Sequence, residues 1–164
     1  MVTPMLAEAD IWRALRGVMD PEIPVVSVVD MGIIRAVEVS AEGVAVTMTP
    51  TFSGCPALDV MRRDIAAAVR DLGATQVTIH TVLHPPWSTE WISEAGREKL
   101  RRFGLAPPPR FTSDPTQVAF FDLAECPRCG STHTSLRNAF GPTLCRMIWY
   151  CHDCQDVFEQ FKPL

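Results

Sequence analysis

Apolar side chains recur at helical spacing near the start of the chain. They are Ala7, Ile11, Leu15 and Val18. This spacing places them on one face of a helix, and the Thr-Pro pair at residues 3–4 supplies an N-cap and a first helical residue. We therefore expect a helix over residues 4–16. The segment that follows, 20–24, carries two prolines and two carboxylates, which favours an ordered loop.

The part of the chain that follows, up to residue 103, alternates between strand-like and helical patterns. Residues 32–39 and 44–48 are rich in β-branched and apolar side chains and predict a hairpin. A second helix is expected over 56–72, because apolar residues recur there every three to four positions. Alternating apolar side chains predict a strand over 76–83, and a third helix is expected over 89–103.

A run of three prolines at 107–109 predicts a stiff linker, so we expect two domains. The first would span 1–104, the linker 105–116 and the second domain 117–164. Short strand-like runs fill the second domain, at 117–121, 132–140, 145–150 and 157–161. The expected fold class is α+β, a small mixed sheet with helices followed by a small β module.

Composition and charge narrow the range of functions. The chain has 164 residues, 47% hydrophobic content and a net charge of -4, which offers no long-range attraction for nucleic acid. No stretch approaches the length of about 20 apolar residues that spans a bilayer, and no secretory leader pattern is present at the start. We therefore expect a cytoplasmic protein with protein partners and no membrane or nucleic-acid partner. The six cysteines then favour thiols or metal ligands over disulfides.

Four of these cysteines form two CxxC pairs, Cys126/Cys129 and Cys151/Cys154, separated by 21 residues. Each CxxC can turn two thiolates toward one point, and two such knuckles complete a tetrahedral zinc site with no open position for a substrate. The pattern therefore predicts a zinc ribbon with a structural metal. Chance pairs and disulfides are the alternatives. His133 and His152 are expected at the surface, because four cysteines already satisfy the metal.

The other two cysteines are harder to interpret. If Pro56 is the first helical residue, Cys55 is the N-cap, where free N–H groups and the helix dipole would stabilise its thiolate. A nucleophile or soft-metal ligand and a buried structural cysteine are both open at Cys55. Cys145 is equally open between buried packing and a reactive second thiol.

Three sequence fragments, in this order, resemble the motifs of the SufT-like iron–sulfur assembly domain family. They are Asp20-Pro21-Glu22, Asp30-Met31-Gly32 and Thr51-Phe52-Ser53-Gly54-Cys55-Pro56. The resemblance covers about residues 6–103. It implies an α+β fold, a cysteine facing a surface pocket and a role in assembling or delivering iron–sulfur clusters.

Under this resemblance Cys55 would handle a transient iron–sulfur cluster, with Asp20, Glu22, Asp30 and Thr51 around it. One cysteine cannot hold a cluster alone. The remaining ligands would come from these carboxylates, from an external thiol or from Cys55 of a second copy, which would require a homodimer. Turn formation and capping are the simpler role for the carboxylates.

A narrower resemblance covers nearly the whole chain and is to the PaaD family of the phenylacetyl-CoA epoxidase system. It rests on the run 140–145, the tail 158–162 and the passage 87–91. It implies maturation of partner subunits, the reductase with its flavin and [2Fe–2S] cluster and the di-iron oxygenase. The chain itself has no Glu-x-x-His pair, glycine-rich fingerprint or HExxH motif, so direct catalysis is not expected. A structural epoxidase subunit, a Cys55-dependent acyl or sulfur transferase and a nucleic-acid adaptor are the alternatives.

Overall fold

The computed structural model describes residues 6–110 and 124–163. The chain forms two compact units, Met1–Trp87 and Ser88–Leu164. Within the described ranges no helix is long and apolar enough to cross a bilayer. The strand predicted at 117–121 lies outside the described residues.

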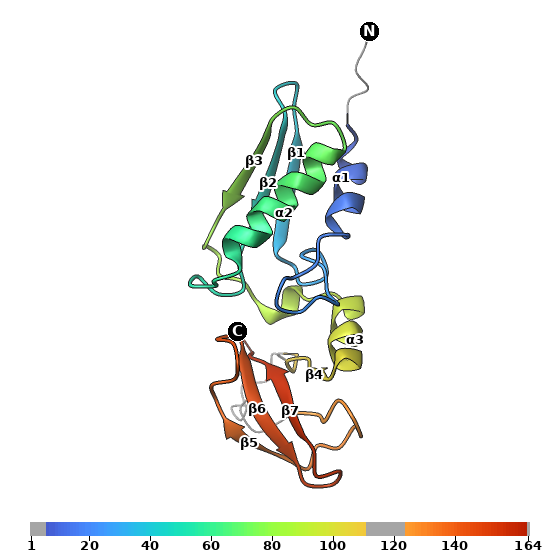
Figure 1. Cartoon of the computed structure of the whole chain (residues 1–164), viewed down its shortest axis with the longest axis vertical. Coiled ribbons are helices and arrows are strands. Elements are labelled where there is room, and N and C mark those ends of the chain that lie inside the picture. Colours follow the sequence, from blue (N-terminus) through green and yellow to red (C-terminus); the bar gives the residue numbers. More distant parts are fainter. Residues whose placement is uncertain (1–5, 111–123, 164) are drawn as a thin grey trace. The chain divides into compact units, whose positions relative to one another are not determined.

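The first unit is a three-stranded sheet with two helices. Its elements are α1 (Glu8–Leu15), β1 (Ile34–Val39), β2 (Val44–Met48), α2 (Leu58–Asp71) and β3 (Val77–Thr81). β1 pairs with β2 antiparallel, and β2 pairs with β3 parallel, so β2 is central. α2 runs across one face of this sheet and contacts α1 (Figure 1). The predicted hairpin, second helix and third strand are confirmed.

The core of this unit lies between the helices and one face of the sheet. Its fully buried side chains include Ile11, Leu15, Val46, Met48, Met61, Ile65 and Val69. They recur every three to four residues in the helices and every second residue in β2, because these periods bring side chains to one face. Gly43 in the β1–β2 turn has a φ of 153°, and a Cβ there would lie 2.5 Å from the carbonyl oxygen of Gln76. That close approach requires glycine.

The pairing of the strands brings three loops to one end of the first sheet, where β1 begins and β2 and β3 end. The Thr49 N–H donates to the Ile33 carbonyl at 2.9 Å, which joins the loop before β1 to the loop before α2. The buried Trp87 indole donates to the Met31 carbonyl at 2.8 Å. This end therefore carries the residues of all three fragments that resemble the iron–sulfur assembly family.

The second unit contains the two CxxC knuckles. It begins at Ser88, well before residue 117, where the sequence predicted the second domain to begin. Its elements are the 3-10 helix η1 (Thr89–Trp91), α3 (Glu94–Phe103), β4 (Leu105–Ala106), β5 (Thr134–Asn138), β6 (Arg146–Cys151) and β7 (Val157–Phe161). The strands form one sheet in the order β4-β7-β6-β5. Trp149, Met147 and Phe158 form its apolar core together with Cys126 and Cys151.

The division between units differs from the predicted domain boundary at residue 104. Leu105 pairs in parallel with Glu159 of β7, and the Arg97 guanidinium bonds the Pro108 carbonyl, so α3 and the start of the proline run belong to the second unit. The three prolines predicted a linker. Their contacts with the second unit could not be predicted, because the residues that they contact are distant in sequence.

Two helix starts also differ from prediction. Leu6 and Ala7 are not helical, so α1 begins at Glu8 rather than at residue 4. The predicted third helix is split, because Ile92 is extended and Ser93 caps a new helix by accepting a hydrogen bond from the Gly96 N–H at 3.0 Å. Gly104 ends α3 in the left-handed conformation, as glycine does at many helix C-termini.

Candidate metal centre and the Cys55 loop

The four cysteines of the CxxC pairs converge in the second unit. Their sulfur atoms all lie within 4.8 Å of one another, with Cys126–Cys154 at 3.7 Å and Cys129–Cys151 at 3.6 Å. All four are free thiols rather than disulfides. A tetrahedral metal with metal–sulfur bonds of about 2.3 Å needs sulfur atoms about 3.8 Å apart. The four thiols therefore fit one tetrahedral metal ion.

Each knuckle is a turn that frees backbone N–H groups to point toward sulfur. A hydrogen bond from the backbone N–H of Cys154 lowers the pKa of the Cys151 thiol to about 7. Burial opposes this shift, and a hydrogen bond from the backbone of Asp153 adds to it. Burial raises the pKa of the Cys154 thiol to about 12. Four close sulfurs cannot all ionise without a cation, so a bound metal would supply the charge that keeps all four as thiolates.

Polar side chains join the two knuckles outside the cysteines. The Asp153 carboxylate, between Cys151 and Cys154, accepts a hydrogen bond from the Ser131 hydroxyl at 2.5 Å and lies 3.0 Å from Nδ1 of His133. Both bonds lower the pKa of the Asp153 carboxyl, and the bond from Ser131 has the larger effect. Sequence reasoning missed this network, although an aspartate between two ligand cysteines could have suggested it.

A second link between the knuckles is the ion pair of Arg128 with Asp156, 2.8 Å apart. Both His133 and His152 are exposed, as predicted, and neither belongs to the group of potential metal ligands. The ring of His152 stacks 4.8 Å from that of His133.

Cys55 lies in the loop that precedes α2, at the sheet end described above. It is half-buried, and the predicted N-cap position is wrong, because Ala57 is the N-cap of α2. Pro56 and Ala57 instead form a turn in which the Cys55 carbonyl accepts from the Leu58 N–H at 3.2 Å. A proline suits such a turn as well as a first helical position. The helix-dipole argument for an activated Cys55 thiolate therefore loses its basis.

The carboxylates expected around Cys55 bond their own loops. Asp20 Oδ1 accepts from the backbone N–H groups of Glu22 and Ile23 at 2.8 and 2.9 Å, and Asp30 Oδ2 accepts from that of Ser27 at 3.2 Å. Both are turn-forming contacts.

Glu22 and Thr51 are half-buried in the loops at the same end of the sheet. Across residues 6–110 and 124–163, the four knuckle cysteines are the only group of three or more potential metal ligands. The structure does not gather Cys55, Asp20, Glu22 and Asp30 into a second such group.

Cys145 follows the β5–β6 turn, is half-buried, and its sulfur lies 3.2 Å from the Thr143 hydroxyl. It is not part of the four-cysteine group. Its position near the knuckles in sequence therefore does not make it a ligand.

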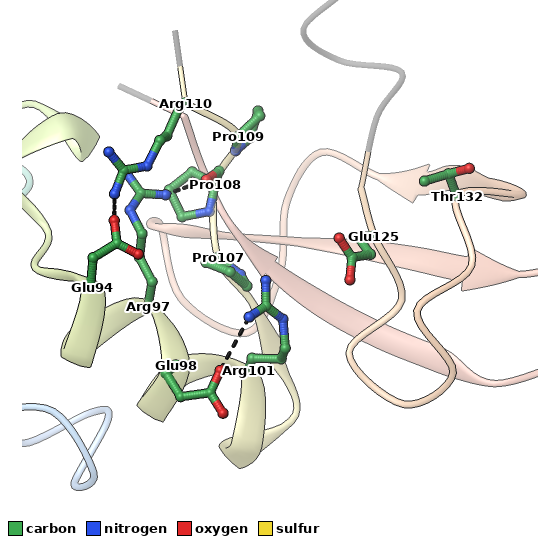
Figure 2. A pocket seen from close by; sticks show the side chains of 10 residues that line it. All are labelled: Glu94, Arg97, Glu98, Arg101, Pro107, Pro108, Pro109, Arg110, Glu125 and Thr132. Carbon is green, nitrogen blue, oxygen red and sulfur yellow. Dashed lines mark hydrogen bonds and ion pairs between the residues drawn. The ribbon is translucent and has the colours of Figure 1, made fainter.

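The second unit also contains a pocket of about 420 Å³, which none of the cysteines lines. Figure 2 shows its wall of three arginines, three glutamates and the proline run. Arg97 is 7% exposed and bonds the carbonyl oxygens of Pro108 at 2.6 Å and Thr89 at 2.7 Å. Arg110 pairs with Glu94, and Arg101 with Glu98. These charges bind one another and the backbone, so the pocket is part of the architecture of this unit.

Comparison with known proteins finds a matching family model for each of the two parts of the chain. A family model described as an iron–sulfur cluster assembly protein matches residues 8–80, and one described as the PaaD zinc beta ribbon domain matches residues 112–162. An Escherichia coli protein described as the D component of a "Putative 1,2-phenylacetyl-CoA epoxidase" is 38% identical over 93% of this chain and 91% of its own length. The chain belongs to the PaaD family.

Other relatives match a smaller share of the chain. Two proteins described as Fe-S protein maturation auxiliary factors, from Porphyromonas gingivalis and Bacillus subtilis, are 45% and 34% identical over 57% and 56% of this chain, each covered over 90% of its own length. A Bacillus anthracis structure of a domain of unknown function is 27% identical, with a TM-score of 0.53, over 57% of this chain and 90% of its own. PaaD-family architecture therefore adds a segment that these shorter proteins do not have.

Proposed function

We propose that this chain is a cytoplasmic accessory factor of the phenylacetyl-CoA 1,2-epoxidase system in aerobic phenylacetate degradation. It assists iron–sulfur cluster or di-iron assembly in partner subunits and does not itself catalyse epoxidation. The observation that carries the proposal is the place of Cys55, in an exposed loop of the segment matched by the iron–sulfur assembly family. The shorter relatives named as maturation factors support the assembly role, and the Escherichia coli relative supports the epoxidase context.

Cys55 supplies the ligand type that iron–sulfur clusters use, and a single thiolate cannot hold a cluster alone. Asp20 Oδ1 and Asp30 Oδ2 accept hydrogen bonds from the backbone of their own loops, and among the described residues neither carboxylate belongs to a group of three or more potential metal ligands. We therefore place the remaining cluster ligands on a carrier thiol or on Cys55 of a second copy. Handover is then a ligand exchange in which the Cys55 thiolate replaces a carrier thiolate at iron, the leaving thiolate takes up a proton, and no oxidation state changes.

The four-cysteine centre has a separate, structural role in this proposal. Cys126, Cys129, Cys151 and Cys154 hold one zinc ion in a closed site. Tetrahedral sulfur ligation suits both zinc and iron, so elemental analysis identifies the metal. The metal, when bound, supplies positive charge that holds the knuckles together, while the cysteines and Asp153 set their spacing.

The Cys55→Ser variant tests the assembly role, because serine keeps nearly the same volume and removes the soft ligand. Cells carrying this variant as their only copy are expected to grow poorly on phenylacetate, and the reductase purified from them is expected to contain less iron and sulfide. Ser53→Ala, an exposed change in the same loop, is the matched control and is expected to leave both readouts unchanged. Poor growth with full metal content in reductase and oxygenase would instead indicate a structural or catalytic role within the epoxidase.

A further inference from the structure

The loop between β5 and β6, residues 139–145, presents apolar side chains to solvent. Phe140 is 72% exposed, more than any other large apolar side chain in the described residues, and Leu144 is 54% exposed. Burial of either side chain away from water is favourable, yet the fold of this unit leaves both outside its core. We call residues 139–145 the ribbon loop.

The ribbon loop is held in one conformation by the surrounding backbone. The Gly141 N–H donates to the Arg146 carbonyl at 2.9 Å, and the Arg146 N–H donates to the Thr143 carbonyl at 3.2 Å. The Lys162 N–H ties the tail to the Cys145 carbonyl at 2.9 Å. A Cβ at position 141 would lie 2.9 Å from the Arg146 carbonyl oxygen, so the turn requires glycine. A loop fixed in this way loses little conformational entropy when a partner binds it.

A positive charge lies beside one of the two apolar side chains, and another lies at the end of the preceding strand. The Lys162 ammonium lies 5.1 Å from the centroid of the Phe140 ring, and Arg137, at the end of β5, lies over Tyr150. The other nearby cation, Arg146, is paired with Glu159 at 2.8 Å. Among the described residues Lys162 and Arg137 thus face aromatic rings rather than carboxylates. A surface that complements this loop has an apolar pocket with acidic groups at its rim.

The comparisons indicate why such a contact belongs on the second unit. The maturation factors match at most 95 residues of this chain, too few to span both the assembly segment, 8–80, and the ribbon segment, 112–162. The Escherichia coli relative matches 156 residues and includes both. Cluster handling by the first segment would leave the ribbon segment available to bind the client, which is the partner protein that receives the cluster.

We propose that the ribbon loop is the client-docking element, with Phe140 and Leu144 inserting into an apolar pocket of a folded protein and Lys162 meeting a carboxylate at its rim. This inference rests on the proposed function and names the contact that selects its client. A second copy of the chain is a poor occupant, because a two-fold contact through this loop would place the cations of both copies in the same interface. An anionic membrane is also a poor occupant for a chain with a net charge of -4.

The test uses the full chain and the reductase component of the epoxidase system, purified without its cluster, in isothermal titration. The double variant Phe140→Ser/Leu144→Ser is expected to weaken binding tenfold or more, because central apolar anchors dominate interface energy. Lys162→Glu is expected to weaken it severalfold and to reverse the effect of added salt. The matched control is Val157→Ser, a 60% exposed apolar residue at the knuckle end of β7, which is expected to change the affinity less than twofold. Unchanged metal content and melting temperature establish that each variant is folded.

Three results would overturn the inference. They are wild-type affinity in the double variant, failure of the wild-type chain to bind the reductase, and loss of cosedimentation with phosphatidylglycerol vesicles in the double variant without loss of reductase binding. The Cys55→Ser variant separates this inference from the function on which it rests. It is expected to bind the reductase normally and to fail in cluster delivery. Normal cluster delivery by Cys55→Ser would overturn the proposed function without bearing on docking.

Discussion

The Arg97 side chain donates a hydrogen bond from Nη1 to the carbonyl oxygen of Pro108, 2.6 Å away, and this contact fastens the proline run to α3. The same guanidinium reaches the Thr89 carbonyl at 2.7 Å, so one buried residue joins η1, α3 and the segment after β4. Burial lowers the pKa of Arg97, and nearby Glu90 opposes that shift. An arginine in this position remains charged, because its ordinary pKa is far above neutrality.

Replacing Arg97 with alanine is expected to destabilise the second unit by about 2–5 kcal/mol, because two buried carbonyl groups lose their donor. Arg97→Lys is expected to have a stability between those of the wild type and Arg97→Ala, since one ammonium group cannot reproduce the planar guanidinium fork. Urea unfolding of the full chain, followed by tryptophan fluorescence, measures the effect. Arg101→Ala is the control, because Arg101 forms an exposed pair with Glu98 and is expected to cost less than about 1 kcal/mol. Equal effects of the two alanine variants would contradict the assigned role.

The Arg97 contact also shows where sequence reasoning reached its limit. Periodicity correctly predicted α2 and the β1–β2 hairpin, because these elements are specified by residues close in sequence. The CxxC spacing correctly brought four cysteines together. The domain boundary was missed because it depends on long-range contacts, such as the pairing of Leu105 with Glu159. The N-cap position of Cys55 was missed because Pro56 fits a turn and a first helical position equally well.

Thiol reactivity is expected to separate the six cysteines into two groups. In the metal-loaded protein at neutral pH, iodoacetamide is expected to modify Cys55 and Cys145 and to spare the four knuckle cysteines, whose thiolates are occupied by the metal. Mass spectrometry before and after treatment with a chelator gives the number and positions of the modified cysteines. Modification of a knuckle cysteine before chelation would mean that the site does not hold metal under those conditions.

Metal content is expected to depend on the knuckles and not on Cys55. Cys126→Ser is expected to reduce zinc from about one per chain to near zero and to unfold the ribbon, because a structural zinc site contributes on the order of 10 kcal/mol to small domains. Cys55→Ser is expected to retain one zinc. Equal loss of zinc in both variants would show that the ligands are misassigned.

The Glu98 carboxylate gives a pH dependence with a definite sign. The hydrogen bond from Arg102 at 2.8 Å, and then that from Arg101, lower the pKa of Glu98 below its ordinary value of 4.5, although slight desolvation opposes the shift. A lowered pKa in the folded state means that the pair stabilises α3 above about pH 4.5 and that this contribution is lost as pH falls through the lowered pKa. Carboxyl NMR titration is expected to show a larger upward shift of this pKa in Arg102→Gln than in Arg101→Gln. No shift in Arg102→Gln would contradict the assignment.

The contact between Asp153 and Ser131 is expected to slow metal release. Asp153 holds the second knuckle against Ser131 and His133 of the first, so removing its carboxylate lets the two CxxC turns separate more easily. Groups that support metal ligands from outside typically change affinity by about 10- to 100-fold, and we expect the exposed Asp153 to lie near the lower end of that range. Transfer of zinc to a coloured chelator is therefore expected to be severalfold to tenfold faster in Asp153→Ala.

Glu125→Ala is the matched control for this release experiment, because Glu125 is an exposed carboxylate next to a ligand cysteine. It is expected to release zinc at the wild-type rate. Ser131→Ala is expected to accelerate release, and the double variant Asp153→Ala/Ser131→Ala to be no faster than Asp153→Ala alone, since both changes remove the same contact. Additive effects would mean that Asp153 and Ser131 act separately on the metal site. A wild-type rate in Asp153→Ala would mean that the four cysteines alone determine metal release.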